Sequence, residues 1–217
     1  MMKVLQASDI HGSMAAASAL AEKAMNYDIV VLVGDITHFG AVPQAEPILA
    51  TVAKSGRPVL FVPGNCDHPS LLGWRPPNKN IINIHGAIVR QGGYDFYGLG
   101  GGNLSPFNTL IEFSEEEFES MLSKFNPASE SFILISHTPP FGVDADIGRG
   151  RHLGSTAIRK FVETKRPLAV CCGHIHEGRS ISKIGETVVV NAGPAKEGFY
   201  ASLEILGKEV KAELHSL

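Results

Sequence analysis

A short apolar run that ends abruptly in a glycine or a polar cluster recurs along this chain. Residues 3–7, 28–33 and 58–62 form such runs, with helical stretches at residues 14–25 and 42–55 between them. Apolar runs without polar alternation predict strands that are buried on both faces, as in parallel sheets. The alternation of strand and helix therefore predicts an α/β fold, in which ligands bind at the carboxyl ends of the strands.

The second half of the chain continues this pattern with more short strands. Ser114 and Glu117 form a capping box that predicts a helix to about residue 125, and Ser155 caps a helix to about residue 164. Buried strands are expected at residues 131–135 and 167–172. Glycine-separated runs predict antiparallel strands at residues 81–84, 87–90 and 94–99, and an antiparallel meander at residues 180–184, 187–192 and 199–215.

Composition narrows the class of protein. The length of 217 residues and 44% hydrophobic content predict one domain, residues 1–217. A net charge of −3 lacks the basic bias of nucleic-acid binders, and no apolar run is long enough to span a membrane. Three cysteines, of which Cys171 and Cys172 are adjacent, make no disulfide framework, so a reducing cytoplasm is the expected compartment.

Side chains that bind metals follow five of the predicted strands. Oxygen and imidazole ligands suit divalent Mn, Fe, Zn, Ni or Co, and two ions bridged by a carboxylate would need about this many ligands. Any one of these residues has an ordinary explanation as a helix cap, a turn residue or a buried histidine. Their recurrence at successive strand ends favours a metal site made of Asp9, His11, Asp35, Asn65, His137, His174 and His176.

Five ordered motifs carry a resemblance to a known family. Asp9-x-His11, Gly34-Asp35, Gly64-Asn65-Cys66-Asp67, Ser136-His137 and Gly173-His174-Ile175-His176 resemble the motifs of the calcineurin-like metallophosphoesterase superfamily. The resemblance implies a four-layer α/β/β/α sandwich of two mixed β-sheets flanked by helices. It also implies two divalent ions, with Mn expected first. One ion would be held by Asp9, His11, Asp35 and His176, and the other by Asp35, Asn65, His137 and His174.

The chain departs from the commoner family pattern at Cys66. Many relatives have a histidine there, which binds phosphate and protonates the leaving group, whereas a subset of small prokaryotic members has cysteine. A thiol with a reference pKa of about 8.5 could donate a proton but grips phosphate poorly, so both a catalytic and a packing role stay open. Asp67 is expected to orient its neighbour or a metal ligand.

The second half of the chain is similar to one branch of the family. The run from His137 to Asp144, followed by Gly150-Arg151-His152 and by Asn191-Ala192-Gly193-Pro194, resembles the branch that contains mammalian metallophosphoesterase-domain proteins and class III cyclic nucleotide phosphodiesterase-like enzymes. Arginine suits bidentate phosphate binding. The candidate contacts to substrate phosphate are His38, Arg149, Arg151 and His152, although solvated loop positions explain the arginines equally well.

The resemblance implies a dinuclear metal-dependent phosphoesterase in which a metal-bridging hydroxide attacks phosphorus. Phosphodiesters are favoured, because a site without the usual histidine manages better with a good leaving group. Two other classes stay open, a non-catalytic scaffold on the same fold and a nuclease. The expected partner is a small phosphorylated substrate rather than a nucleic acid or a membrane, and a homodimer is left open.

Overall fold

The computed structural model describes residues 1–126 and 131–217. Within these ranges the first large sheet has six strands, four of them parallel neighbours that begin at the N-terminus. They are β1 (Met2–Ala7), β2 (Ile29–Val33), β3 (Val59–Val62), β4 (Ile81–Asn83), β15 (Phe199–Leu206) and β16 (Glu209–Ser216). Their spatial order is β16-β15-β1-β2-β3-β4, and β15 and β16 join the parallel core through antiparallel pairs.

The second large sheet also mixes parallel and antiparallel pairs. Its strands are β5 (Ile88–Gln91), β6 (Tyr94–Leu99), β9 (Phe132–Ser136), β12 (Ala169–Cys172), β13 (Ser180–Ile184) and β14 (Thr187–Asn191), in the order β13-β14-β12-β9-β6-β5. Two short pairs lie outside the large sheets, β7 (Gly102–Asn103) with β8 (Glu112–Phe113) and β10 (Ile147–Gly148) with β11 (Arg151–His152).

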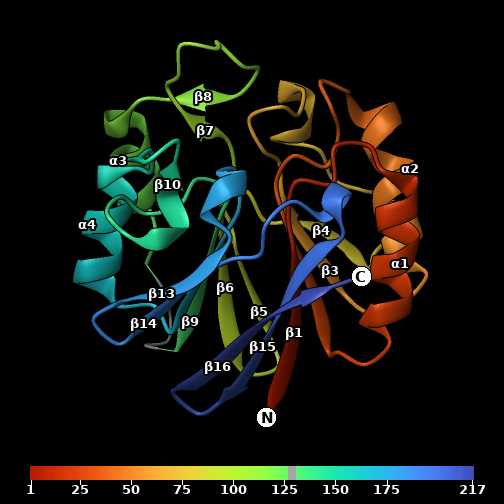
Figure 1. Ribbon diagram of the computed structural model, residues 1–217. Coiled ribbons are helices and arrows are strands. Elements are labelled where there is room, and N and C mark those ends of the chain that lie inside the picture. The colour runs from red at the N-terminus through yellow and green to blue at the C-terminus, as the bar shows by residue number, and fades with distance from the viewer. Residues whose placement is uncertain (127–130) are drawn as a thin grey trace.

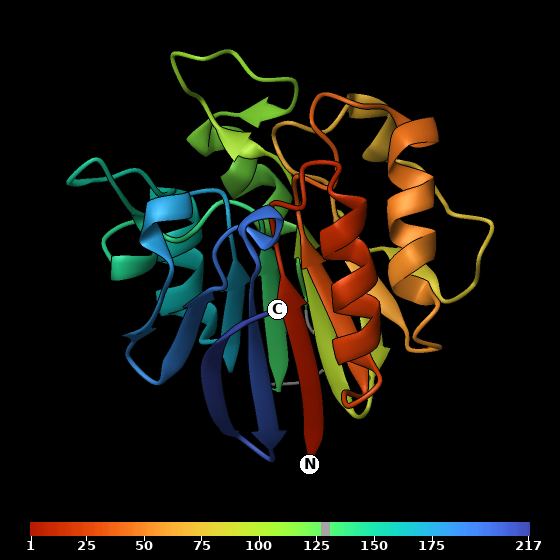
Figure 2. The same cartoon turned by 45° about the vertical axis from the view of Figure 1, so that its right-hand side comes forward.

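Helices cover the outer faces of both sheets (Figure 1). Helices α1 (Met14–Ala24) and α2 (Val42–Ala53) pack on the first sheet, and α3 (Glu115–Ser123) and α4 (Thr156–Lys165) pack on the second, as the turned view in Figure 2 also shows. The fold is therefore the predicted four-layer α/β/β/α sandwich of two mixed sheets. None of the helices in the described ranges is long and apolar enough to cross a membrane.

The apolar runs form strands because each strand is buried on two sides. In β2, Val30 and Leu32 belong to the core under α1 and α2, whereas Val31 and Val33 belong to the core between the sheets. Successive side chains of a strand point to opposite faces, so a strand between two cores must be apolar throughout. The same rule separates the free cysteines Cys171 and Cys172, which face the inter-sheet core and the α3–α4 core respectively.

Most predicted helix boundaries are confirmed within two residues. The Ser13 hydroxyl accepts a hydrogen bond from the Ala16 amide at the start of α1, and the Ser155 hydroxyl accepts one from Ile158 at the start of α4. The capping box of α3 is formed by Ser114 and Glu117, as the sequence predicts. Side chains at these positions satisfy amides that have no partner inside the helix.

Two predictions of antiparallel pairing are wrong in part, although β5–β6, β13–β14 and β15–β16 do pair antiparallel. Residues 81–84 do not join the hairpin of β5 and β6, because β4 pairs in parallel with β3. The connection from β3 to β4 is long enough to bring the chain back to the edge of the sheet where β3 begins, which a parallel pair requires. The predicted C-terminal meander is divided between the sheets. Both edges of β14 are occupied by β12 and β13, so the chain crosses over and β15 pairs with the open edge of β1.

Candidate metal centre and cleft

The carboxyl ends of the parallel strands lie away from the N-terminus in Figure 1, and the candidate metal residues follow these strand ends. Asp9, Asp35 and Asn65 follow β1, β2 and β3 of the first sheet, whereas His137 and His174 follow β9 and β12 of the second. The two sheets therefore supply the two halves of one site. His11 and His176 complete the predicted set.

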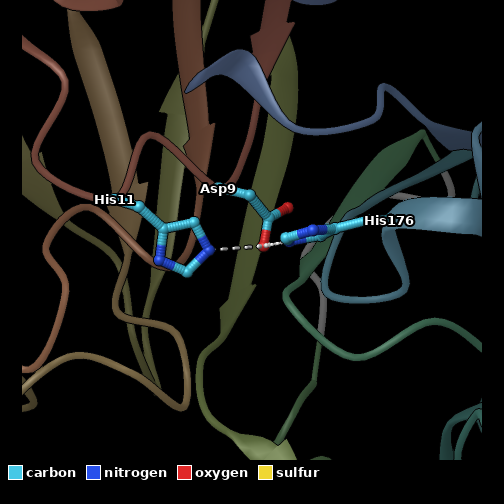
Figure 3. Close-up of side chains that lie close together, drawn as sticks. All are labelled: Asp9, His11 and His176. Atoms are coloured by element: carbon cyan, nitrogen blue, oxygen red, sulfur yellow. Dashed lines mark hydrogen bonds and ion pairs between the residues drawn. The ribbon is translucent and has the colours of Figure 1, made fainter. Parts of the chain in front are cut away.

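Asp9, His11 and His176 form the first cluster (Figure 3). Nε2 of His176 lies 3.3 Å from Oδ1 of Asp9, and Nε2 of His11 lies 3.9 Å from the same oxygen. Both ring nitrogens of His11 are buried and have no hydrogen-bond partner among the described residues. A buried imidazole without a partner, next to a carboxylate oxygen, is what a cation site requires.

Asp35 lies between this cluster and a second one. Its Oδ2 is 3.6 Å from Nε2 of His11, and its Oδ1 is 3.5 Å from Nε2 of His137. The carboxylate is buried, and its Oδ1 also accepts a hydrogen bond of 2.7 Å from the Cys66 amide. Each oxygen of Asp35 therefore faces a different imidazole, as a bridging carboxylate would.

The second cluster is centred on His137. Its Nδ1 lies 2.8 Å from the Val33 carbonyl oxygen, which can only accept a hydrogen bond, so Nδ1 carries the proton. Its Nε2 lies 3.0 Å from Oδ1 of Asn65. In the neutral ring both of these facing atoms are acceptors, so a proton or a metal ion must lie near them. The ring of His174 has its centroid 5.0 Å from that of His137.

The pKa values of the site residues indicate which of them carry charge. Burial lowers the pKa of His137, but the Asp35 carboxylate outweighs this effect and the pKa is raised to about 9. Burial and the charge on His137 lower the pKa of His174 to about 4, so this ring is neutral. Burial also raises the pKa values of Asp9 and Asp35, but the neighbouring imidazoles outweigh it and both carboxyls are ionised.

The backbone is strained at four of these positions. Asp9, His11, Asp35 and His174 have φ angles of +55°, +47°, +50° and +67°, in the left-handed region that residues other than glycine rarely adopt. Each such residue costs on the order of 1 kcal/mol and is maintained only where the surrounding structure fixes it, most often at functional sites. The four residues are aspartates and histidines, which adopt this region more often than most residues other than glycine.

Three glycines pack directly against candidate ligands. Their missing side chains leave room that a Cβ would fill, and all three belong to the motifs from which the site was predicted. A Cβ at Gly34 would overlap His137, one at Gly64 would overlap Asp35, and one at Gly173 would overlap Asp9. The glycines of the motifs are therefore explained by close approach of the backbone to the ligands.

These observations agree with a pair of divalent ions. The donor set is carboxylate, amide oxygen and imidazole, which suits Mn, Fe, Zn, Ni or Co. The unpartnered His11 ring and the facing acceptors of His137 and Asn65 lie on opposite sides of Asp35. The residues present therefore fit the metals that the sequence predicts.

Cys66 and Asp67 differ in what they contact. The Cys66 thiol lies with His11 and Asp35 in one cluster, and burial followed by the Asp35 charge raises its pKa, so the thiol stays protonated. Asp67 is fully buried and accepts hydrogen bonds from the amides of Ile36, Thr37 and Gly64 and from the Thr37 hydroxyl. It joins the turn that carries Asp35 to the turn that carries Asn65.

A cleft of about 910 Å³ opens onto the candidate metal residues Asn65, His174 and His176. Arg149, Arg151 and His152 lie along it, and the β10–β11 hairpin carries them. His38 does not line this cleft, and its ring centroid lies 5.6 Å from that of His11.

Sequence reasoning assigned no role to Asp146 or Thr109. Asp146 is fully buried, and its Oδ1 lies 2.6 Å from Nδ1 of His152 while its carboxylate accepts hydrogen bonds from the amides of Gly142, Val143 and Gly154. It therefore shapes the loop that carries His152. The Thr109 hydroxyl accepts a hydrogen bond of 3.0 Å from the Asn65 amide. The Thr-x-x-Glu spacing of Thr109 and Glu112, which resembles a capping box outside a helix, was the available signal.

Comparisons with known proteins identify the family. The model of the calcineurin-like phosphoesterase family matches residues 2–178, so the chain belongs to this family. It is 38% identical over 198 residues to the uncharacterized protein MJ1162 of Methanocaldococcus jannaschii, a match that covers 89% of this chain and 88% of that protein.

Solved structures share the fold. The crystal structure of TT1561 of Thermus thermophilus has a TM-score of 0.75 at 20% identity, with 98% of both chains covered. A dimetal phosphatase from Danio rerio has a TM-score of 0.72 at 13% identity, with 99% of this chain and 96% of that chain covered.

Proposed function

We propose that the chain is a dinuclear metal-dependent phosphoesterase that hydrolyses phosphodiesters. Asp35 carries this proposal, because its two carboxylate oxygens face His11 on one side and His137 on the other. One ion would be held by Asp9, His11, Asp35 and His176, and the other by Asp35, Asn65, His137 and His174. The family and the dimetal phosphatase of the same fold support this assignment.

Two divalent ions bound there would neutralise charge on the phosphoryl oxygens and lower the pKa of a water to supply a nucleophile. The protein would supply orientation around them. Asp67 holds the turns of Asp35 and Asn65 together, and the Val33 carbonyl fixes the proton of His137 on Nδ1. Arg149, Arg151 and His152 line the cleft, where they would contact the remainder of the substrate.

The preference for diesters comes from Cys66. The residue lies beside His11 and Asp35, where many relatives have a histidine, and a thiol offers less of a grip on phosphate than an imidazole. A substrate whose leaving group departs without strong acid assistance suits such a site. This preference also agrees with the similarity to class III cyclic nucleotide phosphodiesterase-like enzymes.

The test is hydrolysis of bis-p-nitrophenyl phosphate against p-nitrophenyl phosphate. The protein is stripped of metal, reloaded with Mn²⁺, and compared with Asp35→Asn and Cys66→Ala. We expect Mn²⁺-dependent turnover of the diester, a loss of at least about 100-fold in kcat for Asp35→Asn, and retained turnover for Cys66→Ala if the thiol only packs.

Two outcomes would redirect the proposal. A chain that binds two ions but turns over neither ester with Mn, Ni, Co, Zn or Fe would be a scaffold on a phosphoesterase fold. A chain that cleaves DNA, with binding that weakens steeply as salt increases, would be a nuclease. The net charge of −3 argues against the nuclease.

We further propose a small phosphorylated substrate and a cytoplasmic location. The cleft of about 910 Å³ has the size of small-molecule sites, and the three cysteines are free thiols that suit a reducing compartment. A homodimer stays a prediction, which sedimentation of the metal-loaded protein would test.

A further inference from the structure

Both polar atoms of the Asn65 side-chain amide have a partner. Its Oδ1 lies 3.0 Å from Nε2 of His137, and its Nδ2 donates a hydrogen bond of 3.0 Å to the Thr109 hydroxyl. An amide can rotate by half a turn and exchange these two atoms. Only the orientation with Oδ1 toward His137 presents an oxygen to a metal ion, because the nitrogen of an amide does not coordinate.

Thr109 prevents the other orientation because its own hydrogen is already committed. The Thr109 hydroxyl donates to Oε1 of Glu112 at 2.6 Å, and the Thr109 amide donates to the same oxygen at 2.8 Å. The hydroxyl oxygen therefore offers only lone pairs to Asn65. A rotated amide would place Oδ1 against those lone pairs, with no hydrogen between the two oxygens.

Glu112 is fixed in turn by Ser105. The Ser105 hydroxyl and amide donate to the two oxygens of Glu112 at 2.7 and 3.1 Å. Burial raises the pKa of Glu112, but the hydrogen bonds from Thr109 and Ser105 outweigh it and hold the pKa below its usual range. The carboxylate is therefore ionised at neutral pH and acts as a charged acceptor, which makes stronger hydrogen bonds than a neutral one.

The same segment also holds the backbone of Asn65. The amides of Leu110 and Ile111 both donate to the Asn65 carbonyl, at 3.0 and 3.2 Å. A Cβ added at Gly102 would lie 2.9 Å from Cβ of Asn65, so this glycine allows the backbone to approach the residue closely. Residues at both ends of the segment 102–112 thus contact Asn65.

We propose that Thr109 and Glu112 are positioning residues. They hold the side-chain oxygen Oδ1 of Asn65 toward the metal position between Asp35, His137 and His174. This inference rests on the proposed metal centre. It gives residues 102–112 a role, which is to orient one metal ligand. Loss of an outer contact of this kind reduces metal affinity about 10–100-fold in other metal sites.

The test separates this role from a general effect on loop folding. Thr109→Val keeps the shape of the side chain but removes the hydroxyl, and Thr109→Ser restores it. Ser105→Ala removes one donor to Glu112 but leaves both donors of Thr109 in place, so it controls for a general effect on the segment. Binding of Mn²⁺ to each metal-free chain is followed by the electron paramagnetic resonance signal of free Mn²⁺, and thermal melting verifies that each variant is folded.

We expect the wild type to bind two ions. Thr109→Val should retain one ion and bind the other about 10–100-fold more weakly, whereas Thr109→Ser and Ser105→Ala should stay within about threefold of the wild type. Equal binding by the wild type and Thr109→Val overturns the inference, and so does an equal loss in Thr109→Val and Ser105→Ala. If the binding pattern appears without phosphodiester turnover, the inference stands and the proposed function fails. A wild type that binds one ion overturns both.

Discussion

Nε2 of His137 faces Oδ1 of Asn65 across 3.0 Å, although the neutral ring and the amide both present acceptors there. The Val33 carbonyl keeps the other ring proton on Nδ1, and the Asp35 carboxylate raises the pKa of His137 to about 9 against the opposing effect of burial. In the metal-free chain at neutral pH the position between the two side chains is therefore held by a proton, which a metal ion must displace.

The first prediction concerns this proton. Since His137 is protonated below about pH 9 without metal, Mn²⁺ binding at pH 7 should release about one proton per chain from this residue. The affinity for Mn²⁺ should therefore rise with pH between about 6 and 8.5. Calorimetric titration in two buffers of different ionisation enthalpy measures the release. Identical enthalpies in both buffers would show that no proton leaves.

The second prediction concerns Gly34, where a Cβ would overlap the His137 ring and Gly64 at a φ of +78°. Gly34→Ala should lower the free energy of unfolding by about 3 kcal/mol, because strain of the left-handed backbone and overpacking add. Gly56 is a matched control, with a φ of +74° and nothing within 4 Å of the added Cβ. Gly56→Ala should cost only about 1 kcal/mol. Similar losses in urea unfolding of the two variants would contradict the close packing.

The third prediction concerns Asp67, which accepts four hydrogen bonds in a fully buried position. Asp67→Asn places an amide group where three backbone amides donate, and we expect a loss of about 3 kcal/mol in the free energy of unfolding. Asp28 is the control, since its exposed carboxylate accepts one amide hydrogen bond from Lys3. Asp28→Asn should change stability by less than about 1 kcal/mol in the same urea titration. Equal effects would show that the buried network contributes little.

The fourth prediction concerns acid stability. Nδ1 of His85 accepts a hydrogen bond of 2.9 Å from the Gly100 amide, and burial lowers the pKa of His85 to about 4. The unfolded chain takes up a proton below about pH 6.5 while the folded chain does not, so stability falls as pH drops from about 6.5 toward 4. His85→Asn keeps an acceptor and removes the titration.

Urea unfolding of the metal-free proteins at pH 7 and about pH 4.5 measures this effect. The wild type should lose about 2 kcal/mol more than His85→Asn between the two pH values, with allowance for the partial exposure of the ring. Parallel losses in the two proteins would show that His85 titrates normally in the fold.

The strand ends and their candidate ligands could be predicted from the sequence because each ligand residue closely follows an apolar run. Asp35 follows an apolar run directly, and the carboxyl ends of parallel strands must meet, so the clustering of Asp9, Asp35 and Asn65 follows from strand order alone. His137 joined them only because the second sheet packs face to face with the first. The recurrence of ligand residues at strand ends already favoured one site that includes His137, but the packing of two sheets came from the resemblance to a family, since periodicity does not specify how two sheets stack.

Other features depend on contacts between distant segments, which no local pattern reports. β4 and β15 were assigned to the wrong partners because pairing depends on which sheet edges are open. Thr109 lies 44 positions after Asn65, so its spacing to Glu112 gave no indication that it contacts the Asn65 side-chain amide. The left-handed backbone of Asp9 is likewise fixed by its surroundings rather than by residue type.

The most direct test of the dinuclear site is the location of the metals. Crystals of the Mn²⁺-loaded protein, measured at the Mn absorption edge, should show two anomalous peaks on either side of the Asp35 carboxylate. One peak should lie beside Asp9, His11 and His176, and the other beside Asn65, His137 and His174. A single peak, or two peaks that do not share Asp35, would contradict the dinuclear site.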